Sequence, residues 1–395
     1  MGKKQRIIFL IVAIGMLLYA GISLALGIYL LRTCNNGNGY KDDDCYYECN
    51  CDDNKDDDCD DKYNGIFFTP NVANAGVYWW RAISNDNLEN SLHLLNFVER
   101  NGITDIFLTM NDLVNVSGAT AGIVENGSFN ASLMERFIAP TQTFIRSAFS
   151  RGINVYTLFD SGGGIIFPNS PSKNNFHRRM FGLQVFNHIS GPEEQITGIQ
   201  FNIEPHQHGN WRNVFENDVI VGNRNLTRET RRNDLLQMKA DFVVEITTLY
   251  SDMFRIDWCM PFWWDARHDY QLITHNGNPN TQLYQAIINE ITRSTKGGRV
   301  LVMSFRSTAV NMYNISSHIV EYAFQHNIPV FLMATVNEST GPHTRFHEAG
   351  KIEMYYQLNR LRYVVNQDFV AQNLLGVSIH HIMSWYPLQY ERIPN

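Results

Sequence analysis

The chain has 395 residues and a formal net charge of −7, with 32 lysines and arginines against 39 aspartates and glutamates. Nucleic-acid backbones are bound by clustered basic side chains, and this sequence has no basic stripe interleaved with aromatic residues. Nucleic acid is therefore excluded as a partner. The sequence also lacks a Gly-x-Ser-x-Gly nucleophile elbow and a phosphate-binding loop, and Cys259 has no nucleophile context.

An apolar stretch without a charged side chain, residues 7–31, begins near the N-terminus. Roughly 25 residues at 1.5 Å each exceed the 30 Å core of a bilayer, and the stretch is longer than the apolar region of about 7–15 residues in a cleaved signal peptide. Residues 1–6 hold three basic side chains, while only Arg32 follows closely, so the positive-inside rule places residues 1–6 in the cytosol. We predict an uncleaved transmembrane signal anchor and a single-pass type II membrane protein, with the rest of the chain lumenal or extracellular.

Residues 32–65 are acidic and rich in cysteine, and we interpret them as a stem. Five of the six cysteines of the chain lie there: Cys34, Cys45, Cys49, Cys51 and Cys59. Repulsion among the aspartates favours an extended or disordered spacer; calcium binding is an alternative, although the spacing of an EF-hand loop is missing. Five stem cysteines leave one unpaired after two internal disulfides, so a disulfide-linked homodimer is a further alternative.

Acceptor motifs for N-glycosylation also indicate a secretory compartment. They begin at Asn115, Asn126, Asn130, Asn225, Asn314 and Asn337. We expect Asn337 to be unmodified, because it adjoins the candidate catalytic residue Glu338.

Residues 66–395 alternate apolar runs of strand length with amphipathic runs of helix length, which is the pattern of parallel strands joined by helices. The predicted strands are residues 76–80, 103–110, 153–160, 196–204, 254–262, 299–305, 328–336 and 376–383. The predicted helices are residues 87–100, 133–151, 228–253, 281–295, 317–325 and 351–371. Eight such units predict an α/β fold, a (β/α)8 TIM barrel. The alternative is an open doubly wound sheet, but no Gly-x-Gly-x-x-Gly follows the first strand.

Two glutamates end apolar runs, Glu204 at the end of residues 198–204 and Glu338 at the end of residues 330–338. Because desolvation of an unpaired carboxylate costs several kcal/mol, a charged residue in this position indicates function. In a single barrel, both carboxylates would share the C-terminal mouth, where barrel active sites form.

Side chains alternate along a strand, so Gln200, Asn202 and Glu204 are expected to point into the barrel. Hydrolysis of a glycosidic bond needs a carboxylic acid, a second carboxylate and aromatic surfaces for the sugar. Candidate positioning and substrate-binding residues at or near strand ends are Asp160, Asn202, Asp265, Arg306, His381, Trp80, Trp263, Trp264 and Trp385. For the aromatic residues, which also include Trp79 and Tyr386, the alternative is packing beneath loops.

On these residues the chain resembles the barrel glycoside hydrolases that carry an acid/base glutamate at strand four and a nucleophilic glutamate at strand seven. The resemblance implies that Glu204 is the general acid/base and Glu338 the nucleophile. Arg306 is placed to keep Glu338 ionised, with a structural salt bridge as the alternative. Strand four also looks like that of family 18 chitinases, with Gln200 and Asn202 in place of their aspartates.

The resulting hypothesis is a membrane-anchored glycoside hydrolase-like protein that acts on a carbohydrate or glycan without a cofactor. The alternative is a lectin-like surface protein of the same fold that binds carbohydrate without cleaving it. A zinc or manganese site is a third possibility, from Glu204, His206 and His208 together with Asp160 and Asp265, although His-x-His is common in loops.

Overall fold

The computed structural model describes residues 74–110, 124–125, 128–129, 134–161, 164–167, 170–204, 219–221, 224–226, 228–264, 272–365 and 373–388. The predicted signal anchor and stem lie outside these residues, as do Asp265, His206, His208 and the glycosylation motifs at Asn115, Asn126 and Asn130. Within the described ranges, no helix has both the length and the apolar character needed to cross a membrane.

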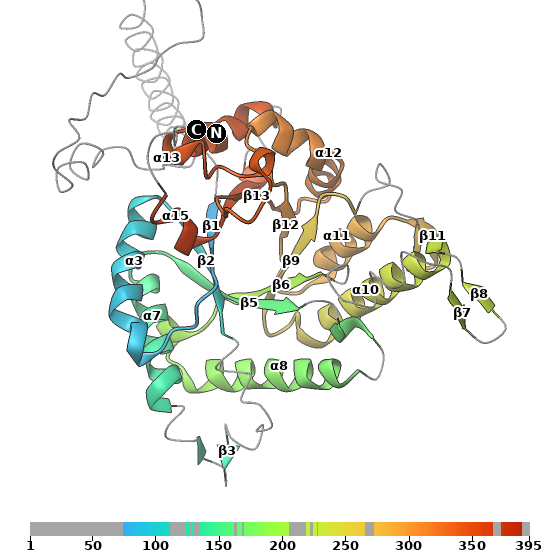
Figure 1. Cartoon of the computed structure of the whole chain (residues 1–395). Helices are drawn as coiled ribbons and strands as arrows, with labels where there is room; N and C mark the ends of the chain where they lie inside the picture. The colour runs from blue at the N-terminus through green and yellow to red at the C-terminus, as the bar shows by residue number, and fades with distance from the viewer. Residues whose placement is uncertain are drawn as a thin grey trace, which may run out of the picture. The chain divides into compact units, whose positions relative to one another are not determined.

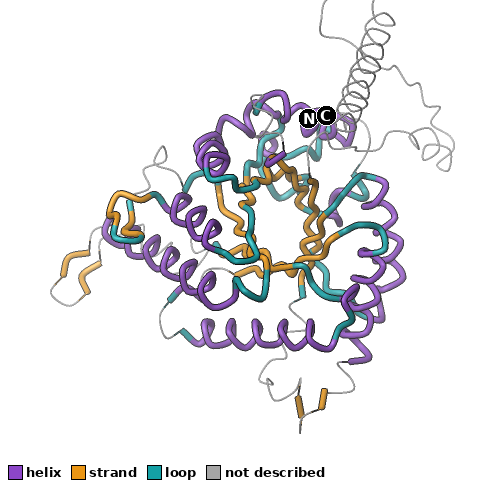
Figure 2. Tube along the Cα trace, turned by 180° about the vertical axis from the view of Figure 1, so that it is seen from behind, coloured by secondary structure: helices purple, strands orange, loops and turns teal. Residues whose placement is uncertain are grey.

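Eight parallel strands form a closed barrel (Figures 1 and 2). They are β1 (Asn74–Trp79), β2 (Asp105–Thr109), β5 (Asn154–Ser161), β6 (Gly198–Ile203), β9 (Arg255–Pro261), β12 (Val300–Met303), β13 (Val330–Thr335) and β14 (Leu375–His380). Strand β1 pairs with both β2 and β14, so the sheet has no edge. The TIM-barrel prediction is confirmed, each predicted strand overlaps one barrel strand, and the open-sheet alternative is wrong.

Helices surround the strands in Figure 2. They are α3 (Leu88–Arg100), α7 (Ala139–Phe149), α8 (Pro171–Ile189), α10 (Arg228–Tyr250), α11 (Leu283–Arg293), α12 (Ala309–Gln325), α13 (Gly350–Val364) and α15 (Ile382–Trp385). Two-stranded hairpins leave the barrel at β3 (Val124–Glu125) with β4 (Ser128–Phe129), at β7 (Val219–Val221) with β8 (Arg224–Leu226), and at β10 (Ile273–His275) with β11 (Asn278–Thr281).

Three helices differ from the sequence prediction, and one of them is the short α15, which begins within the predicted strand 376–383. The sequence analysis missed α8, although Ser170 caps its N-terminus by accepting a hydrogen bond from the Ser172 N–H at 3.2 Å. Helix α12 begins at Ala309 rather than at residue 317, because the Thr308 side chain caps it by accepting from the Asn311 N–H at 3.3 Å. Both caps supply an acceptor to N–H groups that have no partner inside the helix.

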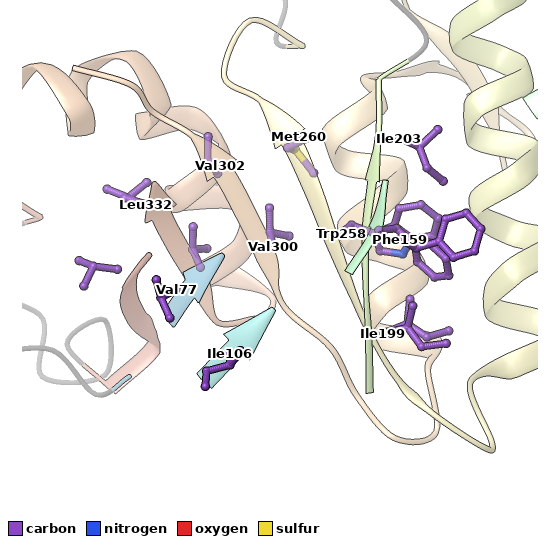
Figure 3. Packing of buried hydrophobic residues seen from close by; sticks show 14 of the residues in the cluster. Val77, Ile106, Phe159, Ile199, Ile203, Trp258, Met260, Val300, Val302 and Leu332 are labelled. Carbon is purple, nitrogen blue, oxygen red and sulfur yellow. The ribbon is translucent and has the colours of Figure 1, made fainter. Parts of the chain in front are cut away.

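A continuous apolar layer lies between the strands and the helices. Figure 3 shows part of it, with Val77, Ile106, Phe159, Ile199, Ile203, Trp258, Met260, Val300, Val302 and Leu332 labelled. These side chains are at most 2% exposed. These side chains point outward from the barrel. Because side chains alternate along a strand, the residues between them face the barrel interior.

The barrel interior is closed below the mouth by a second, aromatic cluster. It contains Tyr78, Phe107, Tyr156, Leu158, Cys259, Leu301, Phe331 and Met333. Its tightest contact is between Phe331 and Gly376, since a Cβ atom at Gly376 would overlap the Phe331 ring. A Cβ atom at Gly76 would lie 2.7 Å from Cε2 of Phe107. The two glycines on neighbouring strands therefore leave the room that these rings fill.

At the N-terminal end, the interior holds a buried ion cluster that we call the floor: Arg299, Asp105 and Asp257. The Arg299 guanidinium lies 3.1 Å from Asp105 and 2.6 Å from Asp257, and all three side chains are at most 2% exposed. The two carboxylates raise the pKa of Arg299 against the opposing effect of its burial. Charges so deep in the fold are tolerated because they are paired.

Candidate active site

The candidate site lies at the C-terminal end of β5 and β6. Asp160 is the last inward-facing residue of β5, its Cα partner in β6 is Asn202, and Glu204 directly follows β6. The alternate β6 residues, Ile199 and Phe201 among them, belong to the outer apolar layer. This is the alternation that the sequence predicted, and it brings Asp160, Asn202 and Glu204 together. We call these three residues the mouth cluster.

One amide nitrogen joins the two carboxylates of the mouth cluster. Asn202 Nδ2 donates to Asp160 Oδ1 at 3.0 Å and to Glu204 Oε1 at 3.1 Å. The two hydrogens of an amide NH2 group diverge by about 120°, so two acceptor oxygens that take one hydrogen each are expected about 5 Å apart. Asn202 is 5% exposed, whereas both carboxylate residues are half-buried. The arrangement presents two acidic groups at a fixed spacing.

Two cations lie behind the mouth cluster. The Arg179 guanidinium stacks 3.9 Å from the ring centre of Phe159; burial lowers the pKa of Arg179 to about 10, and the nearby Asp160 carboxylate opposes the shift. Lys239 of α10 is 0% exposed, and its ammonium lies 4.5 Å from the ring centre of Trp258. Burial lowers the pKa of Lys239 to about 7, while the Glu204 charge acts in the opposite direction. Sequence patterns identified neither cation.

On the opposite side of the mouth, Trp80 and His380 form a pair that joins β1 to β14. The Trp80 indole Nε1–H donates to His380 Nε2 at 3.1 Å, and the Trp80 ring is stacked with Tyr78. Burial, assisted by His381, lowers the pKa of His380 to about 4, so this imidazole is neutral at physiological pH. The sequence analysis selected Trp80 but missed His380; its inward alternation with Gly376 and Ser378 in β14 is the signal that identifies it.

The remaining tryptophans divide into two groups. Trp263 is half-buried and packs edge-on against Trp264. Trp264 is 1% exposed and Trp385 is 0% exposed. Trp385 donates through Nε1 to Tyr355 Oη at 3.2 Å. The rings of Trp264 and Trp385 are therefore covered by protein, and Trp385 packs against Phe97 and Tyr355.

Glu338 and Arg306 contact different partners. Strand β13 ends at Thr335, so Glu338 lies three residues beyond it, and its side chain is 76% exposed and 3.5 Å from His347 Nε2. The Arg306 guanidinium stacks over Phe262 at 5.0 Å and donates to the Phe305 carbonyl. The ion pair expected between Arg306 and Glu338 is therefore not found among the described residues: Glu338 lies next to His347, and Arg306 contacts Phe262 and the Phe305 carbonyl.

His381 directly precedes α15, and its Nε2 lies 3.3 Å from Ser384 Oγ. Burial lowers the pKa of His381, which keeps the ring neutral at neutral pH. Among the described residues, no group of three or more histidine, cysteine or acidic side chains is arranged to hold a metal ion. The histidines of the zinc or manganese alternative lie outside those residues, so that alternative stays a prediction.

No protein-family model matches the chain, and no curated protein matches it in sequence. The solved structures that are similar include a mutant O-GlcNAc hydrolase of Thermobaculum terrenum, at 13% identity and a TM-score of 0.39. The match covers 78% of this chain and 55% of that chain, so this chain spans about half the length of that relative. A GH18 chitinase from Pseudoalteromonas aurantia matches at 11% identity and a TM-score of 0.44, over 78% of this chain and 94% of that one.

The fold is a (β/α)8 barrel. This follows from the pairing of the chain's own strands, and it is the fold that the resemblance to barrel glycoside hydrolases implied. At identities of 13% and 11%, the similar structures carry no argument about the residues of the site.

Proposed function

We propose that this chain hydrolyses glycosidic bonds of a carbohydrate or glycan at the C-terminal mouth of its barrel. The observation that supports this proposal most directly is the mouth cluster, in which Asn202 holds two carboxylates about 5 Å apart. Glycoside hydrolysis with retention uses two carboxyl groups separated by roughly 5–5.5 Å.

Glu204 is the general acid/base in this proposal. It protonates the leaving-group oxygen and later removes a proton from water. Its Oε1 accepts from Asn202, so the transferable proton is carried on Oε2. The sequence assigns the second carboxylate to Glu338, and the structure adds Asp160 as a rival. Trp80 and Trp263 are half-buried and supply the aromatic surfaces that hold a sugar ring.

Turnover of chromogenic glycosides and labelled glycans by the purified full-length chain tests the proposal. We expect Glu204→Gln to lower kcat/KM by at least about 10³-fold, because it removes the proton donor and keeps the shape. Glu193→Gln is the matched control, since Glu193 is an exposed glutamate on the 3-10 turn η4 (Pro192–Glu194) and should leave turnover unchanged. Equal activity of wild type and Glu204→Gln would refute the role of Glu204.

A lectin-like barrel is the second candidate. It is favoured by Gln200 and Asn202, which place neutral amides on β6 where the family 18 pattern has aspartates. Glycan-array binding by the same protein separates the two functions. Binding without turnover that survives Glu204→Gln would identify a carbohydrate-binding protein and exclude the hydrolase.

We also propose that residues 7–31 anchor the chain in a membrane with the barrel lumenal or extracellular. The uncharged apolar stretch and the basic residues before it support this topology. Protease protection of microsomes that contain the expressed chain provides the test. A barrel that is digested without detergent would overturn the topology.

A further inference from the structure

We propose that Asp160, and not Glu338, is the second catalytic carboxylate of this site, with Asn202 setting its distance from Glu204. This inference rests on the proposed glycoside hydrolase function. In this inference Asp160 replaces Glu338 as the residue that attacks the sugar. The two reacting groups then lie at the ends of the neighbouring strands β5 and β6.

The first argument is the shared hydrogen-bond donor. Asp160 Oδ1 and Glu204 Oε1 are each within 3.1 Å of the same nitrogen, so their separation is fixed by one amide group rather than by loop conformation. Asp160 and Asn202 are paired in the barrel sheet, and Glu204 is two residues from Asn202. Groups that must act together within about 0.5 Å are best supported by such rigid elements.

The second argument is the position of Glu338. Its carboxylate is 76% exposed, next to His347, and its backbone carbonyl accepts a hydrogen bond from Arg345. No hydrogen bond links the described side chain of Glu338 to the mouth cluster. This carboxylate is therefore screened by water, lies in the loop after β13, and has no hydrogen-bond donor in common with Glu204.

The third argument is electrostatic. Arg179 lies close enough to Asp160 for the two charges to interact, and its half-buried guanidinium stacks 3.9 Å from the ring centre of Phe159. Attraction between a guanidinium and a carboxylate favours the ionised carboxylate. A nucleophile must be ionised, whereas a general acid must carry a proton, so Arg179 beside Asp160 fits the assignment of roles.

The reaction then proceeds in two balanced steps. Asp160 Oδ2 attacks the anomeric carbon, the bond from that carbon to the leaving oxygen breaks, and the proton of Glu204 goes to the leaving oxygen. The product of this step is a glycosyl ester of Asp160. Glu204 next removes a proton from water, the hydroxide oxygen attacks the anomeric carbon, and the ester bond breaks. The sugar keeps its anomeric configuration, and both carboxyl groups return to their starting states.

Covalent trapping locates the nucleophile directly. The full-length chain is incubated with a 2-deoxy-2-fluoro glycoside of a sugar that it cleaves, digested, and mapped by peptide mass spectrometry. We expect one glycosyl adduct on the peptide that contains Asp160. An adduct on the Glu338 peptide would overturn the inference but keep the hydrolase, and so would a product of inverted configuration without an adduct.

Variants provide a second measurement that a merely structural residue would not affect. We expect Asp160→Gly to lose at least about 10³-fold in kcat/KM and to be rescued by azide, with release of a glycosyl azide of inverted configuration. Glu338→Gln separates the two assignments: turnover like that of wild type supports Asp160, and a loss comparable to that of Asp160→Gly would overturn the inference. Failure of azide to rescue Asp160→Gly, in a variant with wild-type circular dichroism, would overturn the inference.

The outcomes also separate this inference from the proposed function. Turnover that depends on Glu204 but not on Asp160 removes only the inference. A wild-type chain that cleaves no glycoside removes both, because no reaction would then remain in which Asp160 could take part.

Discussion

The two ends of the barrel interior carry charge in opposite ways. On the floor, Arg299 is bound by Asp105 and Asp257, and every group is at most 2% exposed. In the mouth cluster, two half-buried carboxylates are separated by a neutral amide. The floor balances each charge with its opposite, which stabilises one protonation state. The mouth leaves two like groups close together, which suits groups that exchange protons. Burial and pairing therefore distinguish the carboxylates of the floor from those of the mouth cluster.

The largest effect is expected when the balance of the floor is broken. Arg299→Met should lower the free energy of unfolding by about 3–5 kcal/mol, because it leaves the Asp105 carboxylate buried without a cation and leaves Asp257 only the partly exposed Arg255, at 3.3 Å. Urea denaturation measures the change. Arg136→Met is the control, since Arg136 is 66% exposed and 4.0 Å from Asp86, and should cost at most about 1 kcal/mol. A floor variant as stable as the control would contradict this account of the floor.

The next effect concerns Lys239, a buried cation without the partners that the floor provides. Its ammonium has no hydrogen-bond partner among the residues that the structure describes, so Lys239→Met should raise the free energy of unfolding at pH 6 by about 1–4 kcal/mol. Burial lowers the pKa of Lys239 to about 7, against about 10.4 in an unfolded chain. Between these values the unfolded state binds the extra proton, so wild-type stability gains as pH rises.

The advantage of Lys239→Met should therefore be full below pH 7 and shrink as pH approaches 10, which thermal melts across that range can follow. Lys351→Met is the matched control. Lys351 is 5% exposed, but its ammonium donates to the Tyr386 carbonyl at 3.0 Å, so its replacement should destabilise. An advantage that does not vary with pH would show that Lys239 is not titrating.

A smaller effect on stability is expected in the mouth. Glu204→Gln should change the free energy of unfolding by less than about 1 kcal/mol, although the proposed function requires it to remove activity, because the half-buried side chain keeps its shape and its amide oxygen can still accept from Asn202. Parallel unfolding and turnover assays on one preparation measure both quantities. Loss of stability comparable to that of Arg299→Met would place Glu204 with the floor rather than with the mouth.

The smallest effect is expected at the rim. Glu338→Gln should alter the free energy of unfolding by less than about 0.5 kcal/mol, since the side chain is 76% exposed and its partner His347 is solvated. Thermal melts at low and high salt would reveal any larger contribution. A change above 1 kcal/mol at low salt would mean that the rim charge is coupled to the fold.

The fold was predictable because each strand is a short apolar run and the helices between them stop at definite residues. Helix α8 was missed because the exposed Phe181 places an apolar ring on a different face from Phe176, Met180 and Leu183, which obscures the helical periodicity. Glu204 was placed correctly because it directly follows β6. Glu338 was placed less well, because residues 336–338 continue past β13 into a turn in which Asn337 Oδ1 accepts from the Ser339 N–H at 3.0 Å.

Contacts between strands were the part that the sequence could not reveal. The pairing of Asp160 with Asn202 depends on the register of β5 against β6, and Trp80 meets His380 only because β1 closes onto β14. Tryptophans at strand ends look alike in sequence, yet Trp80 lines the mouth and Trp385 is buried against Phe97. Only three-dimensional neighbours separate these cases.

The contact of Phe331 with Gly376 has a consequence for how this barrel can diverge. The Phe331 ring on β13 occupies the space that a side chain at position 376 on β14 would need. The sizes of the residues at positions 331 and 376 are therefore coupled. A descendant that acquires alanine or serine at position 376 must first, or at the same time, accept a smaller residue at position 331. The pair should therefore change together in any lineage that retains this aromatic interior.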